Sequence, residues 1–387
     1  MNILIWYPVN ELAPVGGPAG YLFNLKEKLD DSSFNFEFLP DTQSVGSGKS
    51  QIKKRIRKKF KFFLDNVTIK KIIDKKDTRN IDLSRYDAIH FHSTKDLYFA
   101  REIIKDYKGK IVLTSHSPKP LHQEIINDEL QVGKFQKIIF KNVMDSLSKV
   151  DIFAFERADY IIFPCKEAEE PYSNNWEWYR EFSIENSKKY KYIPTCINEV
   201  NYKTNKRDIL KKYGIPEGAK VLCYVGRHNE TKGYDALKKI GESILRSHQD
   251  VYFLIAGKEE PLKGLTDSRW IEVGWTKDPH SIINASDIFI LPNKETYFDL
   301  ILLEVLSLGK PVLLSNTGGN KYFKKFSSNG FKYFHNVNEA KNELSDLVAL
   351  NKNDLNSLGE QNRDIFISNF KTDIFVSEYE KVLKTII

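Results

Sequence analysis

The sequence contains few cysteines and no long apolar run. Its three cysteines, Cys165, Cys196 and Cys223, lie far apart in 387 residues, with no Cys-x-x-Cys spacing. They therefore indicate neither a disulfide framework nor a zinc site. No apolar run approaches the roughly 20 residues that span a bilayer, and the start MNILIWYPVNELAP has no basic segment ahead of a long apolar stretch, as a secretory leader would. We expect a soluble or peripheral protein of the reducing cytosol.

Positive charge is moderate in total but concentrated in one stretch. The formal net charge is +7, and eleven Lys or Arg residues from Lys53 to Lys76 are accompanied only by Asp65 and Asp74. Apolar residues recur among them at near-helical spacing, so residues 52–76 form a basic amphipathic segment. Three interpretations remain: a solvated surface, an anchor on the inner, anionic face of a membrane near a lipid-linked substrate, or a nucleic-acid site. Since no nucleic-acid-binding module accompanies the charge, we expect no nucleic-acid partner.

The length of the chain suggests two domains. Both halves alternate short β-branched runs with longer helical patterns, which is typical of α/β domains with parallel sheets. Proline and glycine interrupt any regular period in residues 191–218, where we place the linker. We predict domains at 1–197 and 198–370, and a C-terminal helix at 371–387 that can return to the first domain. The predicted strands are Asn2–Tyr7, Phe34–Leu39, Ala88–His92, Lys110–Thr114, Tyr160–Pro164, Lys220–Val225, Val251–Ala256, Trp270–Val273, Ile288–Leu291 and Pro311–Leu314.

Glycines follow the first predicted strand. In the run VGGPAGYLFNLKEKL, Gly16 and Gly17 permit backbone conformations closed to other residues and let a ligand approach the main chain. A tight turn into a helix explains them equally well. The run lacks the Gly-x-Gly-x-x-Gly spacing of dinucleotide-binding folds, which weakens a nicotinamide-dependent interpretation.

Histidines end two of the predicted strands. His90 and His92 lie in IHFHS, and His116 lies in VLTSHSP. Ligands of open α/β sheets bind at the carboxyl ends of the strands, so His116 is the best candidate for a sugar-binding or catalytic group. A structural role is the alternative for each of the three.

The run VGRHNETKG carries a pair of cations. Arg227 ends a predicted strand, and Lys232 precedes Gly233 at a predicted helix start. A guanidinium fork, a point charge and free backbone N–H groups together suit a phosphate. Cations paired with surface carboxylates are the alternative.

The run KETYFDLILLEVLSLGKPVLLSNTGGN follows later. Thr296 and Asp299 resemble a capping box, which predicts a helix from about Tyr297 to Leu308, ended by Gly309. Glu304 lies within its apolar stretch, where we expect it to be buried and to need hydrogen-bond donors. Ribose hydroxyls would serve, and a buried ion pair with a neighbouring cation is the alternative. The loop Asn316, Thr317, Gly318 and Gly319 comes next and offers backbone contacts.

Taken together, these runs resemble glycosyltransferase family 4, a group of retaining enzymes among the glycosyl transferases group 1. The resemblance rests on GGPAGYLFNL, DAIHFHS, VLTSHS, ERADYIIFP, VGRHNETKG, ASDIFILPN and FDLILLEVLSLGKPVLLSNTGGN, in family order. It implies the GT-B fold, an α/β architecture of two Rossmann-like domains whose parallel sheets face a central cleft. It also implies an acceptor held by the first domain and a nucleotide-sugar donor held by the second.

The resemblance also implies roles for single residues. By position, Arg227 and Lys232 contact the donor diphosphate and stabilise the leaving group without a metal or other cofactor. Glu304 holds the ribose hydroxyls, and His116 lies at the donor sugar. The implied sets are His116, Arg227, Lys232, Thr296 and Glu295 for catalysis, and Gly16, Gly17, Arg227, Lys232, Phe298, Asp299, Leu300 and Glu304 for donor binding.

The chain departs from the family at one position. Where the family has a first glutamate, eight residues before Glu304, this chain has Thr296, and the usual Gly-Phe-Gly is Tyr297-Phe298-Asp299. Glu295, Thr296 with backbone donors, or Asp299 can take the place of the missing carboxylate. The departure leaves the transferred sugar open.

The expected activity is transfer of a hexose from a UDP-sugar to a glycan acceptor, lipid-linked or free, with retention at the anomeric carbon. One alternative is a catalytically silent GT-B partner or chaperone of another transferase, which Thr296 favours and Arg227, Lys232 and Glu304 oppose. A nucleotide-sugar epimerase or a nicotinamide-dependent oxidoreductase shares the sheet architecture but has no supporting residues here.

Overall fold

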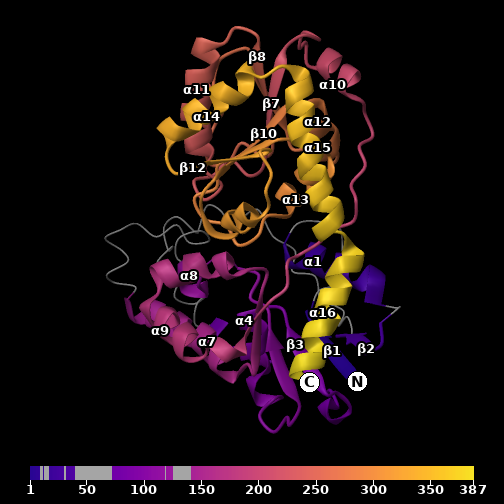
Figure 1. The fold of residues 1–387 in the computed structure, drawn as a ribbon. Coiled ribbons are helices and arrows are strands. Elements are labelled where there is room, and N and C mark those ends of the chain that lie inside the picture. The colour runs from indigo at the N-terminus through magenta and orange to yellow at the C-terminus, as the bar shows by residue number, and fades with distance from the viewer. Residues whose placement is uncertain (9–11, 13–16, 30–31, 40–71, 118, 125–140) are drawn as a thin grey trace, which may run out of the picture. The chain divides into compact units, whose positions relative to one another are not determined.

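The computed structural model describes residues 1–8, 12, 17–29, 32–39, 72–117, 119–124 and 141–387 (Figure 1). The chain divides into two compact units. The first unit comprises Met1–Phe163, Tyr172–Ile193 and Val376–Ile387, and the second comprises Pro164–Pro171 and Pro194–Phe375.

A parallel six-stranded sheet forms the centre of the first unit, in the order β2-β1-β3-β4-β5-β6. The order reverses between β1 and β3, and such switch points are where open α/β sheets bind ligands. The strands are β1 Asn2–Trp6, β2 Asn35–Phe38, β3 Ala88–Phe91, β4 Lys110–Leu113, β5 Tyr160–Phe163 and β6 Tyr190–Tyr192.

Helices connect these strands, as parallel pairing requires. They are α1 Pro18–Leu29, α4 Thr94–Phe99, α5 Leu121–Gln123, α7 Lys141–Arg157, α8 Glu170–Asn175 and α9 Glu177–Glu185. The C-terminal helix α16 (Thr372–Ile386) gives its residues from Val376 onward to the same unit. Its Tyr379 is fully buried, and the hydroxyl of Ser32 donates to its Glu380.

The second unit contains another parallel six-stranded sheet, in the order β12-β11-β10-β7-β8-β9. Here β7, the first strand along the chain, lies between β8 and β10, so the switch point falls between β7 and β10. The strands are β7 Lys220–Val225, β8 Val251–Ala256, β9 Trp270–Gly274, β10 Ile288–Leu291, β11 Val312–Ser315 and β12 Phe331–Phe334.

Helices cover both faces of this second sheet. Helices α11 and α14 pack together on one face, while α10, α12, α13 and α15 lie on the other (Figure 1). The helices are α10 Lys206–Lys212, α11 Tyr234–Ser247, α12 Pro279–Ala285, α13 Leu300–Ser307, α14 Val337–Ala349 and α15 Lys352–Asn369, with a 3-10 segment, η6, at Gly318–Lys325.

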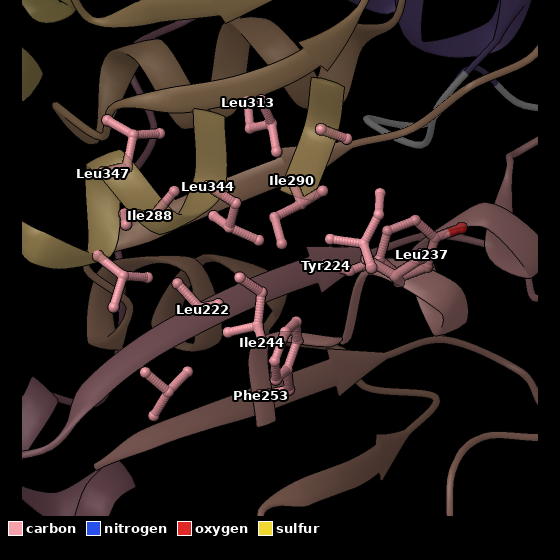
Figure 2. Close-up of a cluster of buried hydrophobic side chains, with 14 of the residues drawn as sticks. Leu222, Tyr224, Leu237, Ile244, Phe253, Ile288, Ile290, Leu313, Leu344 and Leu347 are labelled. Atoms are coloured by element: carbon pink, nitrogen blue, oxygen red, sulfur yellow. The ribbon is translucent and has the colours of Figure 1, made fainter. Parts of the chain in front are cut away.

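The hydrophobic core under α11 and α14 shows how periodicity builds this unit. Helix α11 buries Leu237 and Ile244, seven residues apart, and α14 buries Leu344 and Leu347, three residues apart, which are spacings of one helical face. Alternate residues of the strands meet them from the sheet. Figure 2 shows this contact, with Leu222, Tyr224, Phe253, Ile288, Ile290 and Leu313 facing the two helices.

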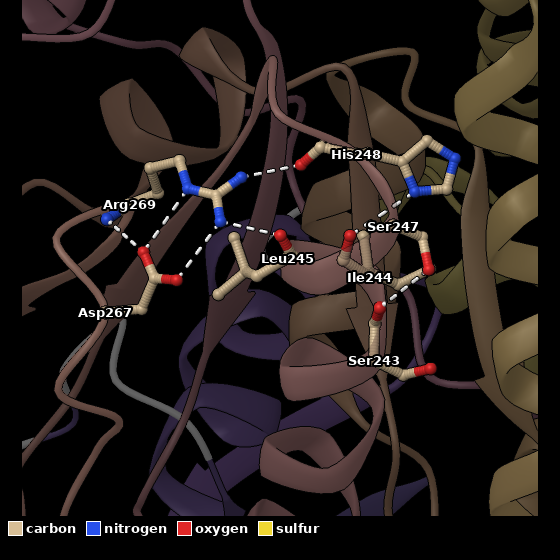
Figure 3. Close-up of polar contacts among 7 residues, drawn as sticks. All are labelled: Ser243, Ile244, Leu245, Ser247, His248, Asp267 and Arg269. Atoms are coloured by element: carbon tan, nitrogen blue, oxygen red, sulfur yellow. Dashed lines mark hydrogen bonds and ion pairs between the residues drawn. The ribbon is translucent and has the colours of Figure 1, made fainter.

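Arg269 fixes the carboxyl end of α11. Its Nη1 donates to the carbonyl of His248 at 2.6 Å and its Nη2 to that of Leu245 at 2.6 Å, while Asp267 holds the same guanidinium (Figure 3). The last carbonyls of a helix have no partner within the helix, and a cation there also complements its dipole. The helix that begins at the candidate site is thereby tied down at its far end.

All ten predicted strands are present among the twelve that the structure describes, and the predicted α/β class is confirmed. Most bounds agree within one residue, and β11 runs Val312–Ser315 in place of Pro311–Leu314. The sequence missed β6 and β12. Both are short edge strands, of three and four residues, with a lysine at the second position. Runs this short show too few alternations to predict a strand from pattern alone.

In the part of the chain that the structure describes, no helix is long and apolar enough to cross a membrane. Most of the basic segment 52–76 lies outside the described residues, which resume at Ile72.

Candidate functional site

Three loops meet at the carboxyl end of the second sheet. Gly233 has φ 67°, and a Cβ atom there would lie 1.7 Å from the carbonyl oxygen of Pro292. A Cβ on Gly318 would lie 2.1 Å from the carbonyl of Thr296, and one on Gly319 would lie 2.0 Å from that of Tyr297. The loops after β7, β10 and β11 therefore pack main chain against main chain, and only glycine permits this approach. They meet at the switch point between β7 and β10, where a ligand is expected.

Lys232 lies in this junction, directly before the N-cap of α11. Its Nζ contacts a carboxylate oxygen of Asp299 at 2.7 Å, and its backbone N–H donates to the side chain of Asn229. Asn293 donates a second hydrogen bond to Asp299. The lysine predicted to bind phosphate is thus held by a carboxylate from the next loop.

Arg227 differs from Lys232 in its surroundings. Its side chain is exposed beyond the end of β7, and its carbonyl accepts from the hydroxyl of Tyr224 at 2.9 Å. No described carboxylate forms an ion pair with its guanidinium. Arg227 is therefore an available fork for an anion, a few residues before the lysine that is already paired.

Helix α13 begins later than predicted. It runs from Leu300, with Asp299 as N-cap, so the expected start at Tyr297 is wrong. Thr296 does not cap the helix: its carbonyl accepts from the N–H of Gly319, and its side chain is 1% exposed. Phe298 is buried among aromatic rings that include Phe323 and Phe370. Tertiary packing therefore keeps residues 296–298 out of the helix, where local capping rules predicted helix.

Three residues are candidates to take the place of the family's first glutamate. The hydroxyl of Thr296 is buried and has no hydrogen-bond partner among the described residues. Glu295 is half-buried beside it. The carboxylate of Asp299 forms an ion pair with Lys232. Phe298, buried by its ring, can offer a ligand only its main chain, and Leu300 is half-buried at the first turn of α13.

Glu304 has a partner that the sequence did not reveal. His280, in α12, lies 3.0 Å from a Glu304 carboxylate oxygen. Both side chains are about a quarter exposed, at 27% and 25%, so the expectation of a buried carboxylate is wrong. Burial opposes charge on His280, but the hydrogen bond and the charge of Glu304 outweigh it and raise the pKa of His280. This pair is the ion-pair alternative, and it leaves a second carboxylate oxygen for a ligand.

Glu170, the first residue of α8, meets the loop after β11 within the second unit. A carboxylate oxygen of Glu170 accepts from the N–H of Gly318 at 3.2 Å and from Lys321 at 2.6 Å. The polar loop 316–319 was expected to offer backbone contacts to a ligand. One of its N–H groups, that of Gly318, is already bonded to Glu170.

In the first unit, three histidines cluster at the carboxyl ends of β3 and β4. His90 Nε2 lies 2.8 Å from the hydroxyl of Thr114, and its Nδ1 lies 2.5 Å from that of Tyr379 in α16. His92 Nδ1 lies 2.8 Å from His116 Nε2. The His90 and His92 rings are 4.1 Å apart at their centroids. The candidate His116 is thus the outermost member of a connected row.

Every histidine of this row is neutral at physiological pH. Burial lowers the pKa of His116 to about 3, and burial together with nearby His116 lowers that of His90 to about 3. Burial and its two histidine neighbours lower the pKa of His92 well below its usual value. A neutral imidazole can accept as well as donate a hydrogen bond. His116 also has φ 56°, a backbone conformation that is uncommon outside glycine and frequent at functional sites.

The glycine run after β1 is only partly described. Gly17 has φ 81° and its carbonyl accepts from the N–H of Tyr21 in α1, whereas Gly16 lies outside the described residues. Among the described residues, no group of three His, Cys, Asp or Glu side chains is arranged to hold a metal ion.

Sequence reasoning missed three residues that the structure brings to these sites: Asn293, His280 and Tyr379. Asn293 follows β10 at the switch point, and that position could have marked it. His280 and Tyr379 carry no local signal, since each reaches its partner from a helix 24 or 289 residues away in the chain.

A family model covers most of the second unit. Residues 205–365 match the model of the glycosyl transferases group 1. This region is similar to that family. The match contains Arg227, Lys232, Asp299 and Glu304, so the switch-point site lies wholly inside the group 1 region.

Relatives with known names show the same similarity to glycosyltransferases. The chain is 33% identical, over 33% of its length and 36% of the relative's, to UDP-Gal:alpha-D-GlcNAc-diphosphoundecaprenol alpha-1,3-galactosyltransferase of Escherichia coli. It is 23% identical, over 81% of its length and 82% of the relative's, to the O-antigen biosynthesis glycosyltransferase WclY of Escherichia coli. The chain thus spans about a third of the first relative and most of the second.

Solved structures extend the likeness outside the group 1 region. The whole chain matches sucrose-phosphate synthase from Thermosynechococcus elongatus, with TM-score 0.66, 14% identity and 98% of that chain covered. It also matches Anabaena HepE in complex with UDP-glucose, with TM-score 0.60, 14% identity and 100% of that chain covered. The predicted GT-B fold is confirmed.

Proposed function

We propose that this protein is a retaining, metal-independent glycosyltransferase that moves a sugar from a UDP-sugar donor to a glycan acceptor in the synthesis of a surface polysaccharide or glycoconjugate. The observation that carries the proposal is the placement of Arg227 and Lys232 at the switch point, beside the close approach at Gly233. The names of the Escherichia coli relatives and the UDP-glucose complex of HepE support the donor and the pathway class.

The roles of the cations follow from the charge that develops during transfer. When the bond between the sugar and the diphosphate breaks, negative charge grows on the leaving phosphate oxygen. Arg227 supplies a planar fork and Lys232 a point charge, and positioned cations stabilise such an oxygen without a divalent ion. No cofactor is proposed. Glu304, held by His280, turns its remaining oxygen to the ribose hydroxyls of the nucleotide.

We propose that Asp299 takes the place of the family's first glutamate. Its carboxylate lies on Lys232 at 2.7 Å, so it adjoins the phosphate beside which the sugar sits. Thr296 is too buried to reach a sugar without repacking against Gly318 and Gly319. His116, with its neutral ring and acceptor capacity, is proposed as a hydrogen-bonding group for a sugar hydroxyl.

A second candidate function is a catalytically silent GT-B protein that assists another transferase. One observation favours it: Lys232 is already paired with Asp299, where the family has glycine. A lysine neutralised in this way would bind a diphosphate more weakly than an unpaired one. Arg227, which has no ion-pair partner among the described residues, argues against this candidate.

The test is nucleoside diphosphate release from a panel of UDP-, GDP- and ADP-sugars, with and without glycan acceptors. We expect release from one UDP-sugar, and a loss of about 10²- to 10³-fold in turnover for Arg227→Ala or Lys232→Ala, because each removes one stabilising group from the leaving phosphate. The matched control is Lys294→Ala, since Lys294 pairs with Asp235 on the surface. Retained turnover in both site variants would remove the phosphate assignment, and UDP binding without release from any donor would favour the silent protein.

A membrane contact is proposed for the basic segment 52–76, on its sequence alone. Cations and apolar residues together suit an anionic surface, and their attraction is screened by salt. We expect salt-sensitive binding to vesicles containing anionic lipid. Replacing Lys53, Lys54, Arg55, Arg57, Lys58 and Lys59 by glutamine should abolish it, and unchanged vesicle binding by that variant would contradict the proposal.

A further inference from the structure

We propose that Asp299 is a specificity-determining residue, which makes the site discriminate against free nucleoside diphosphate in favour of the sugar nucleotide. This inference rests on the proposed function, because it assumes that Lys232 binds the diphosphate.

Two contacts fix the carboxylate. Lys232 Nζ lies 2.7 Å from one Asp299 oxygen, and Asn293 donates to the other. Asn293 is itself 1% exposed, and its loop is locked against Gly233, where no side chain fits. Although Asp299 is the N-cap of α13, its side chain makes no capping hydrogen bond. Its side chain is therefore directed to the lysine, and it is only 18% exposed.

The position of the carboxylate gives Lys232 a permanent negative neighbour. An anion that reaches the lysine must share it with Asp299 and must approach the carboxylate within a few ångströms. Like charges this close disfavour one another, and partial burial strengthens the effect relative to water. The site should therefore prefer the ligand that brings less negative charge next to Lys232 and Asp299.

Donor and product differ in that charge. In a sugar nucleotide the distal phosphate is a diester with one negative charge. After transfer, the same phosphate is terminal in the nucleoside diphosphate. Its second ionisation has a pKa near 6, as for other phosphate monoesters, so it carries close to two charges at neutral pH. Asp299 opposes the additional charge, which weakens product binding relative to donor binding and favours product release.

The test compares two ligands that differ in this charge and contain no sugar. Isothermal calorimetry on the full chain measures the dissociation constants of UDP and of its β-methyl ester, which is a diester. The variant is Asp299→Asn, which keeps the shape and an oxygen acceptor for Lys232. The matched control is Asp235→Asn, because Asp235 forms an equally close ion pair, at 2.7 Å, with Lys294 instead of Lys232.

We expect Asp299→Asn to tighten UDP about tenfold, an effect between those of one charge a few ångströms away in water and near a protein surface. The methyl ester should tighten only about threefold, because its distal phosphate carries about half the charge. Asp235→Asn should leave both constants unchanged. As a second measurement, inhibition of donor turnover by UDP should become about tenfold stronger in Asp299→Asn.

Two outcomes separate the inference from the proposed function. If the wild-type chain binds UDP but Asp299→Asn changes both ligands equally, or weakens UDP, the inference is wrong and the proposed function stands. If neither UDP nor its ester binds the wild-type chain, the proposed function fails, and the inference fails with it.

Discussion

The carboxyl ends of the two sheets present opposite kinds of chemistry. In the first unit, His90, His92 and His116 lie in a row that burial keeps neutral, in which the rings of His90 and His92 are in contact and His92 and His116 share a hydrogen bond. In the second unit, Lys232 and Asp299 form an ion pair in a junction of glycine loops, and Arg227 lies exposed near it in the chain. Neutral imidazoles suit hydroxyl groups, whereas fixed cations suit phosphates. Similar sheets thus differ in chemistry because of a few residues at the ends of their strands.

The largest expected effect is a loss of stability when the backbone contact at Gly233, in the second site, is disrupted. Gly233→Ala should destabilise the second unit by at least about 3 kcal/mol, because it adds a left-handed alanine and a clash with the Pro292 carbonyl. The control is Gly214→Ala, with φ 64° and nothing within 4 Å of its Cβ, which should cost only about 1 kcal/mol. Chemical denaturation measures both. Equal losses would show that the close approach at Gly233 is not tight.

Acid should destabilise the first unit through its buried histidines. The pKa of His90 is about 3 in the folded protein and about 6.5 in an unfolded chain, so the unfolded state binds the proton first. Stability therefore falls as pH drops from about 6.5 toward 3, by at most about 1.4 kcal/mol per pH unit for this group. Asp151, whose pKa burial raises to about 7, acts in the opposite direction and partly offsets the loss.

The measurement that isolates the histidine is the slope of unfolding free energy between pH 6 and pH 4. We expect a shallower slope in His90→Gln than in the wild type. His116→Gln, at a less buried position, provides the same comparison if the first variant does not fold. Identical slopes in all three proteins would show that these histidines are charged in the folded state.

A smaller loss of stability should follow when the hydrogen bond between α16 and β3 is removed. Tyr379→Phe removes the hydroxyl that lies 2.5 Å from His90 Nδ1 and leaves that buried nitrogen without its partner. We expect a loss of about 1–3 kcal/mol in unfolding free energy. Tyr202→Phe, at a side chain that is 48% exposed, is the control and should change stability by less than about 0.5 kcal/mol. A neutral Tyr379→Phe would mean that water or another group satisfies His90.

The smallest effect concerns the one histidine with a raised pKa. Glu304→Gln should lower the pKa of His280, because burial is then opposed only by the hydrogen bond with the Asn201 backbone and the charge of Asp278. In the wild type, the pair adds stability below the ordinary histidine pKa of about 6.5 and loses it as pH rises through the raised pKa. A proton NMR titration of the His280 ring measures the shift. An unchanged pKa would show that Glu304 does not hold His280 in solution.

Sequence reasoning succeeded where the signal is local. Ten strands followed from β-branched runs, Gly233 marked the start of α11, and Gly309 ended α13 with φ 62°. It failed at Tyr297, because a capping pattern there competes with backbone contacts to Gly318 and Gly319, which lie about twenty residues further along. Local rules describe a residue's own turn of helix and cannot include a distant loop that occupies its carbonyl.

The sequence by itself determined the α/β class, the parallel order of elements and the placement of Arg227 and Lys232 after a strand. These depend on periodicity, glycine and charge, which act over a few residues. Only the tertiary structure decided that Lys232 meets Asp299, that Glu304 meets His280 and that Tyr379 closes the histidine row. Those contacts join side chains 24 to 289 residues apart, and they are set by strand order and by which helix covers which edge of a sheet.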